Sequence, residues 1–188
     1  MSDSPISRLL VRAREGDEQA EAELADALAP ELRRLAHEQL RRRPDSLLES
    51  AALVNEIWIR LCGDGVRDFE GRLHFLRAAA RTMRSVLVDR ARSRTALKRG
   101  GGGQKQELVE DEVTLEEKRA LEDLLALDDA LATLAPDDRA LAELRLFAGL
   151  SCGEIAGLGL GAERSLQRRW GELSARLKLR LGRREETR

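Results

Sequence analysis

The side chains best suited to hydrogen bonding with a nucleic acid gather near the C-terminus of the chain. Arginine and glutamine pair with the edges of guanine and adenine, and arginine also neutralises phosphate. Here they alternate with apolar residues that would form the core face of one helix. An ordinary solvated helix in a bundle has the same composition, so this alternative stays open. The candidate contact residues are Arg164, Ser165, Gln167, Arg168 and Arg169.

A second basic segment, residues 74–94, contains a single acidic residue, Asp89. Several arginines on one long helix can follow a phosphate backbone, and His74 and Phe75 at its start could stack on an unpaired base. The alternatives are a solvated charged face and a core position for Phe75. The candidates are His74, Phe75, Arg77, Arg81, Arg84, Ser85 and Arg92.

The segment 53–61, with sequence LVNEIWIRL, carries more apolar surface than one core face needs. Such a surplus is typical of a helix that docks on another protein. Burial between neighbouring helices explains the pattern equally well. The candidates for partner binding are Leu53, Val54, Asn55, Glu56, Ile57, Trp58, Arg60 and Leu61.

No residue pattern indicates an enzyme, a metal or a cofactor. The run RGGGGQK lacks the spacing of a phosphate-binding loop and follows a helix instead of a strand. Cys62 and Cys152 lie far apart, and His37 and His74 have no ligand-like spacing to them. Without a signal peptide or a long apolar run, we expect a reduced, cytoplasmic protein that does not contact a membrane.

The elements that position these residues are predicted to be helices alone, because Ala, Leu, Arg and Glu dominate and β-branched runs are few. We expect Ser50 to cap one helix and another to start near Gly71 or Arg72. Pro136 suits a helix start. Ser151 and Glu154 form a capping-box pattern before a short helix, a glycine-rich turn and a longer helix, the order of a helix-turn-helix.

Charge divides the chain, although the net charge is only −1. Residues 77–99 are basic, and residues 107–138 are strongly acidic. Four glycines, 100–103, precede the acidic stretch and favour a flexible segment. We therefore predict a helical domain over 1–98, a linker over 99–118 and a helix-turn-helix domain over 119–188.

The arrangement resembles the extracytoplasmic-function sigma factors of the sigma-70 class over nearly the whole chain. The resemblance rests on residues 31–61, on HFLRAAARTMRSVLVDRARSR with TALKRGGG after it, on residues 124–156, and on the RRW at 168–170. It implies two all-α modules, sigma2-like and sigma4-like, on a tether.

The resemblance also implies partners and roles. Core RNA polymerase would bind through its β′ clamp helices, at the helix around residues 53–61, and through its β flap. The basic helix around residues 77–94 would capture and melt the −10 element of promoter DNA. The helix around residues 164–169 would enter the major groove of the −35 element. An anti-sigma factor is a further partner that the sequence leaves open.

The turn of the helix-turn-helix departs from the family pattern. The family usually has Leu-Gly-Val-Ser where this chain has Gly159, Leu160, Gly161 and Ala162, and Arg169 stands where an acidic residue is common. Two alternatives to a sigma factor therefore stay open. One is a helix-turn-helix regulator that acts without polymerase, and the other is a polymerase-binding adaptor that no longer reads the −35 element.

Overall fold

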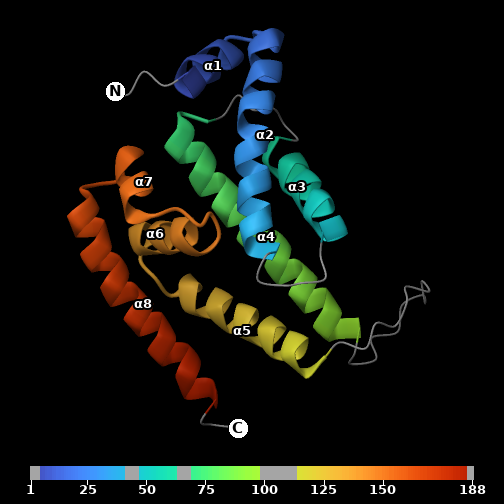
Figure 1. The fold of residues 1–188 in the computed structure, drawn as a ribbon, viewed down its shortest axis with the longest axis vertical. Helices are drawn as coiled ribbons and strands as arrows, with labels where there is room; N and C mark the ends of the chain where they lie inside the picture. Colours follow the sequence, from blue (N-terminus) through green and yellow to red (C-terminus); the bar gives the residue numbers. More distant parts are fainter. Residues whose placement is uncertain (1–4, 41–46, 63–68, 98–113, 186–188) are drawn as a thin grey trace.

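The computed structural model describes residues 5–40, 47–62, 69–97 and 114–185, and this part of the chain is built from helices without a strand (Figure 1). The prediction of an all-α fold is confirmed. The helices are α1 (Pro5–Arg14), α2 (Glu18–Leu40), α3 (Leu47–Cys62), α4 (Arg72–Leu97), α5 (Leu115–Ala132), α6 (Pro136–Leu146), α7 (Cys152–Gly157) and α8 (Glu163–Glu185).

Helix α4 is the longest of the described helices, with 26 residues, and it begins at Arg72 as the sequence predicts. One side of it buries Phe75, Leu76 and Met83 completely. Helix α3 packs on α4, and α2 packs on α3 and α1. Figure 1 shows α4 running diagonally past α2. The apolar side of α4 belongs to the core of the N-terminal half, which consists of α1, α2, α3 and α4.

Helix α6 occupies the centre of the C-terminal half, which consists of α5, α6, α7 and α8. It contacts α4, α5 and α8, and its five consecutive residues from Ala140 to Leu144 are all buried (Figure 1). Pro136 stands at its start, with Asp137 and Asp138 in the first turn, where acidic side chains interact favourably with the helix dipole. Helix α8 covers α6 with an apolar row of Leu166, Leu173 and Leu177.

The two halves pack against each other along α4. Helix α4 contacts both α5 and α6, and the buried residues of both halves form one continuous apolar cluster. A solvent-open pocket of about 430 Å³ lies between the halves at the start of α4. It is lined by Arg34 and Leu76 from one half and by Leu150 and Glu154 from the other. The contact between the halves is therefore not filled along its whole length.

Two boundaries differ from the sequence prediction. Helix α3 begins at Leu47, so Ser50 lies inside the helix and is not its cap. Helix α5 begins at Leu115, so the last four residues of the predicted linker are helical. Thr114 precedes α5, and threonine is a residue type that favours a helix start. Residues 98–113, which hold most of the predicted linker, lie outside the described part of the chain.

The short helix α7 depends on its N-terminal cap. The Ser151 Oγ accepts a hydrogen bond from the Glu154 backbone N–H at 3.1 Å, which satisfies a donor that the helix cannot. We expect Ser151→Ala to lower the free energy of unfolding by about 1 kcal/mol. Urea denaturation followed by circular dichroism measures this change. Ser93→Ala, at an exposed position of α4, is the control and should shift stability by less than about 0.5 kcal/mol. Equal effects in the two variants would contradict the assignment.

Candidate nucleic-acid interface

A short capped helix, a tight turn and a long basic helix lie next to one another at the C-terminal end. The capping box of α7 is complete, because the Glu154 carboxylate also accepts a hydrogen bond from the Ser151 N–H at 2.7 Å. In the turn, Gly159 and Gly161 have φ angles of +89° and +147°. Residues with a Cβ rarely adopt such angles. The two glycines that depart from the family pattern are therefore the residues that allow this turn.

Four of the five candidate residues on α8 are exposed. Arg164, Ser165 and Arg168 lie on the outer side of the helix, and Gln167 donates a hydrogen bond to Glu163 at 3.0 Å. Arg169 differs, because its Nε donates to Asp138 of α6 at 2.6 Å and the side chain is half-buried. In this structure Arg169 joins α8 to α6 and does not belong to the exposed set.

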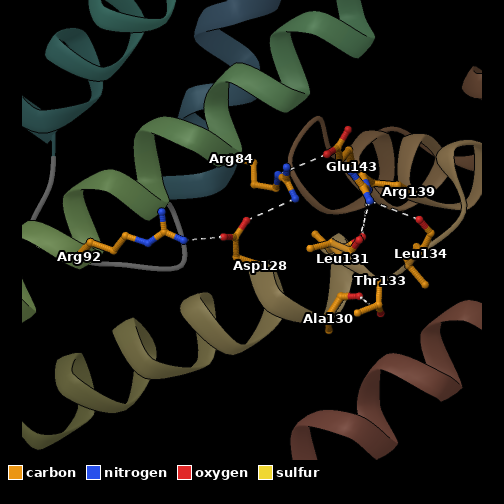
Figure 2. Close-up of polar contacts among 10 residues, drawn as sticks. Arg84, Arg92, Asp128, Ala130, Leu131, Thr133, Leu134, Arg139 and Glu143 are labelled. Carbon is orange, nitrogen blue, oxygen red and sulfur yellow. Dashed lines mark hydrogen bonds and ion pairs between the residues drawn. The ribbon is translucent and has the colours of Figure 1, made fainter.

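Helix α8 is oriented by polar contacts as well as by its apolar row. The guanidinium of Arg145 lies 5.2 Å from the ring centroid of Trp170, a cation–π contact. Arg180 donates to the Thr133 hydroxyl at 2.7 Å. Arg139 donates to the carbonyl oxygen of Leu131 at 3.0 Å (Figure 2). It also donates to that of Ala132 at 2.6 Å, and together these bonds cap the end of α5. These contacts link α5, α6 and α8 to one another and so fix the position of α8, including its exposed side.

Apart from Phe75, the candidate residues on α4 share one side of the helix, since they recur at steps of three, four or seven residues. Arg81, Ser85 and Arg92 are exposed, and Arg77 is half-buried. Arg84 is different: its side chain is 15% exposed. Figure 2 shows it pointing from α4 toward α5 and α6. The basic side of α4 is thus open at some positions and covered at Arg84.

Arg84 lies between two carboxylates of the C-terminal half. Its Nη1 is 3.3 Å from an oxygen of Asp128 on α5, and its Nε is 3.3 Å from Oε1 of Glu143 on α6. Arg92 donates to the other oxygen of Asp128 at 3.1 Å (Figure 2). We call these four residues the Arg84 cluster. It is the set of ion pairs that joins the basic side of α4 to α5 and α6.

Glu143 carries a charge at a position where water is almost absent. It is 6% exposed and is the buried charged residue of the described part of the chain. Burial raises the pKa of Glu143, while the nearby charges of Arg84, Arg81, Arg139 and Arg77 act in the opposite direction. Burial is therefore the largest influence on the pKa of Glu143.

Phe75 and His74, the candidates for base stacking, differ in access. Phe75 is fully buried and packs edge-on against Phe69, with the ring centroids 5.2 Å apart. The expectation that Phe75 stacks on a base is therefore wrong for this structure, and the alternative core position is observed. His74 is exposed, and its Nδ1 accepts a hydrogen bond from the Glu70 N–H at 3.3 Å. Only His74 of this pair presents its ring to solvent.

Helix α3 separates into a core side and an outer side. Leu53 and Ile57 are fully buried, so the expectation that they contact a partner is wrong for this structure. Val54, Trp58 and Leu61 are partly buried against the core. Asn55 is exposed, and so is Ile59, one turn further on, which is 59% exposed. Ile59 was not among the sequence candidates. An apolar residue off the stripe of Leu53 and Ile57 is the sequence signal that could have identified it.

The remaining polar candidates on α3 are paired with α4. Glu56 accepts from Arg60 at 2.9 Å within α3 and from Arg90 of α4 at 2.9 Å. Arg60 also donates to Asp89 of α4 at 3.0 Å. These exposed and half-buried ion pairs link α3 to α4, and the outer side with Asn55 and Ile59 stays free of them.

The fold and these surfaces define a helix-turn-helix protein with a second basic helix. The model of the family described as ECF sigma factor matches residues 3–183, and the chain belongs to this family. Members of the family bind RNA polymerase and DNA and direct transcription initiation. No curated protein matches the chain. Within the described residues, none of the helices is long and apolar enough to cross a membrane.

The capping box of α7 makes stability depend on pH. Hydrogen bonds from Ser151 lower the pKa of Glu154 below its usual 4.5. A lowered pKa contributes stability that is present above the unfolded-state pKa and is lost as the pH falls through the folded-state pKa. We expect the wild type to exceed Glu154→Gln in free energy of unfolding by a constant margin down to about pH 5, and by less below it.

Urea denaturation at a series of pH values checks this expectation. Glu172→Gln, at an exposed position on α8, is the control. A margin for Glu154→Gln that does not shrink in acid would contradict the role of the Glu154 charge.

Proposed function

We propose that this chain is a promoter-specificity subunit that uses three separate helices. Helix α3 binds the β′ clamp helices of core RNA polymerase, α4 engages and melts the −10 element, and α8 enters the major groove of the −35 element. The observation that carries the proposal is the presence of basic residues on exposed sides of two helices, α4 and α8, in a chain of the ECF sigma factor family.

The outer side of α3 suits a protein partner. Ile59 is 59% exposed and stands beside Asn55 on a helix whose opposite side is fully buried. An exposed large apolar side chain next to polar groups is typical of an interface centre with a polar rim. The proposed polymerase contact therefore moves from the stripe of Leu53 and Ile57 to the side that carries Ile59.

The basic side of α4 suits a phosphate backbone. Arg81 and Arg92 are exposed on it, with His74 and Ser85 on the same side of the helix. Long-range attraction by several arginines gives salt-dependent affinity for a nucleic acid. The exposed imidazole of His74 offers a ring that could stack on an unpaired base, which is the state of the −10 element once it has melted.

The exposed side of α8 suits a major groove. Arg164, Gln167 and Arg168 follow the turn directly, and the N-terminal part of a recognition helix is the part that contacts base edges. Arg169 is left out of the proposed contact set because it pairs with Asp138. The half-buried position of Arg169 indicates that it positions α8.

The polymerase contact is tested by Ile59→Asp. A carboxylate at the centre of an apolar contact must lose its water, so we expect affinity for core polymerase to fall at least about tenfold. Val11→Asp, at a 56% exposed apolar residue of α1, is the matched control. Fluorescence anisotropy of the labelled chain with purified core enzyme measures both affinities. Equal affinities for the two variants would contradict the placement on α3.

The role of α4 is tested by Arg81→Glu, because Arg81 is exposed and is not one of the ion-paired residues of the Arg84 cluster. We expect initiation from a cognate promoter to fall at least about tenfold, while core binding stays unchanged. The promoter is one selected from a promoter library with core enzyme. Arg33→Glu, an exposed charge reversal on α2, is the control. Normal initiation by Arg81→Glu would contradict DNA engagement by this side of α4.

A further inference from the structure

Glu163, the first residue of α8, holds the side chain of Gln167. Its Oε1 accepts a hydrogen bond from the Gln167 Nε2 at 3.0 Å. Both residues are exposed, and their spacing of four places them on the same side of the helix. Gln167 is one of the residues that the proposed function assigns to the major groove. A carboxylate at this place repels DNA phosphates, so phosphate affinity does not account for it.

The hydrogen bond fixes which end of the Gln167 amide faces away from Glu163. An ionised carboxylate only accepts hydrogen bonds, so it must face the amide nitrogen and not the amide oxygen. No described residue donates to the Oε1 of Gln167. A glutamine without such a partner can rotate its amide by half a turn and offer either a donor or an acceptor at the same place. Glu163 removes that choice and leaves Oε1 as the free acceptor.

Gly153 of α7 makes room for the Glu163 carboxylate. A Cβ at position 153 would lie 3.2 Å from the Oε1 of Glu163, which is tighter than an ordinary van der Waals contact. Helix α7 precedes α8 across the turn and lies next to its start (Figure 1). The glycine therefore lets the carboxylate rest against the first turn of α7. This contact limits the positions of the Glu163 side chain, and a restrained partner orients Gln167 more firmly.

We propose that Glu163 is a positioning residue that decides which bases Gln167 accepts in the −35 element. This inference rests on the proposed function of α8. In the major groove, adenine and cytosine present an exocyclic amino group, whereas guanine and thymine present carbonyl oxygens. An amide oxygen accepts a hydrogen bond from an amino group and is repelled by a carbonyl oxygen. Gln167, held by Glu163, therefore selects a base with an amino group at one position of the strand that it faces.

The test measures initiation in vitro with core polymerase on cognate-promoter templates that carry each base in turn at each position of the −35 element. We expect the wild-type chain to favour adenine or cytosine over guanine and thymine at one position by at least about fivefold. The adenine and cytosine templates show which amino base is read. In Glu163→Gln the new amide can donate as well as accept, so the Gln167 amide can turn over. The preference should then fall to less than about twofold.

The matched control is Glu172→Gln, which removes one carboxylate from an exposed position of the same helix and changes the net charge equally. It should keep the wild-type preference. An equal loss of preference in the two variants would overturn the proposal, because charge alone would then explain it. An unchanged preference in Glu163→Gln would also overturn it, since a carboxylate that serves only the stability of α8 has no effect on base choice.

A second variant tests the same arrangement from α7. Gly153→Val adds methyl groups where the Glu163 carboxylate lies. We therefore expect it to weaken the preference at the position affected by Glu163→Gln, and at no other position. An unchanged preference, or a loss spread over several positions, would overturn the role assigned to Gly153.

Gln167→Ala separates this inference from the proposed function. If Gln167→Ala loses the preference and Glu163→Gln keeps it, Gln167 reads its base without Glu163, so the inference fails and the proposed role of α8 stands. If Gln167→Ala keeps the wild-type preference at every position, Gln167 does not contact a base. The proposed function then fails at this residue, and the inference fails with it.

Discussion

Helix α4 has to satisfy two demands, and the arrangement of the other helices follows from them. One side buries Phe75, Leu76 and Met83 in the N-terminal core, and another carries arginines three and four residues apart. The helical repeat of 3.6 residues allows one helix to carry both sets on different sides. Helix α3 covers the apolar side, and α5 and α6 reach the basic side (Figure 1). Without the apolar side, α4 would have no fixed position from which to present its charges.

Local rules predicted most of the fold. The start of α4, the capping box of Ser151 and Glu154, and Pro136 at the start of α6 depend on residues within one helical turn of each other. The prediction that Ser50 caps α3 was wrong. Several polar residues precede the apolar stripe of this helix, and the sequence does not show which of them stands at its start. Boundaries depend on such close competition, whereas the existence of each helix depends on a long repeated pattern.

The surfaces were harder to predict, because exposure depends on neighbours that are distant in sequence. Arg81, Arg84 and Arg92 have one residue type and helical spacing, yet packing by α5 and α6 leaves Arg84 15% exposed and Arg92 61% exposed. The sequence was insufficient in the same way for two apolar residues. Phe75, a candidate for base stacking, is buried, and Ile59, which was not a candidate, is exposed. Asp128 and Glu143 could be recognised as partners of α4 only once the packing of the two halves was known.

The Arg84 cluster places charges within a contact that is otherwise apolar. The buried apolar residues of both halves form one continuous cluster, and the carboxylates of Asp128 and Glu143 meet Arg84 beside it. Replacing buried ion pairs by packed apolar residues is often neutral or stabilising, so these pairs do not account for the strength of the contact. Removal of one partner, however, leaves the other charge buried and unpaired, which is strongly destabilising. The ion pairs therefore make the contact depend on which side of α4 lies against α5 and α6.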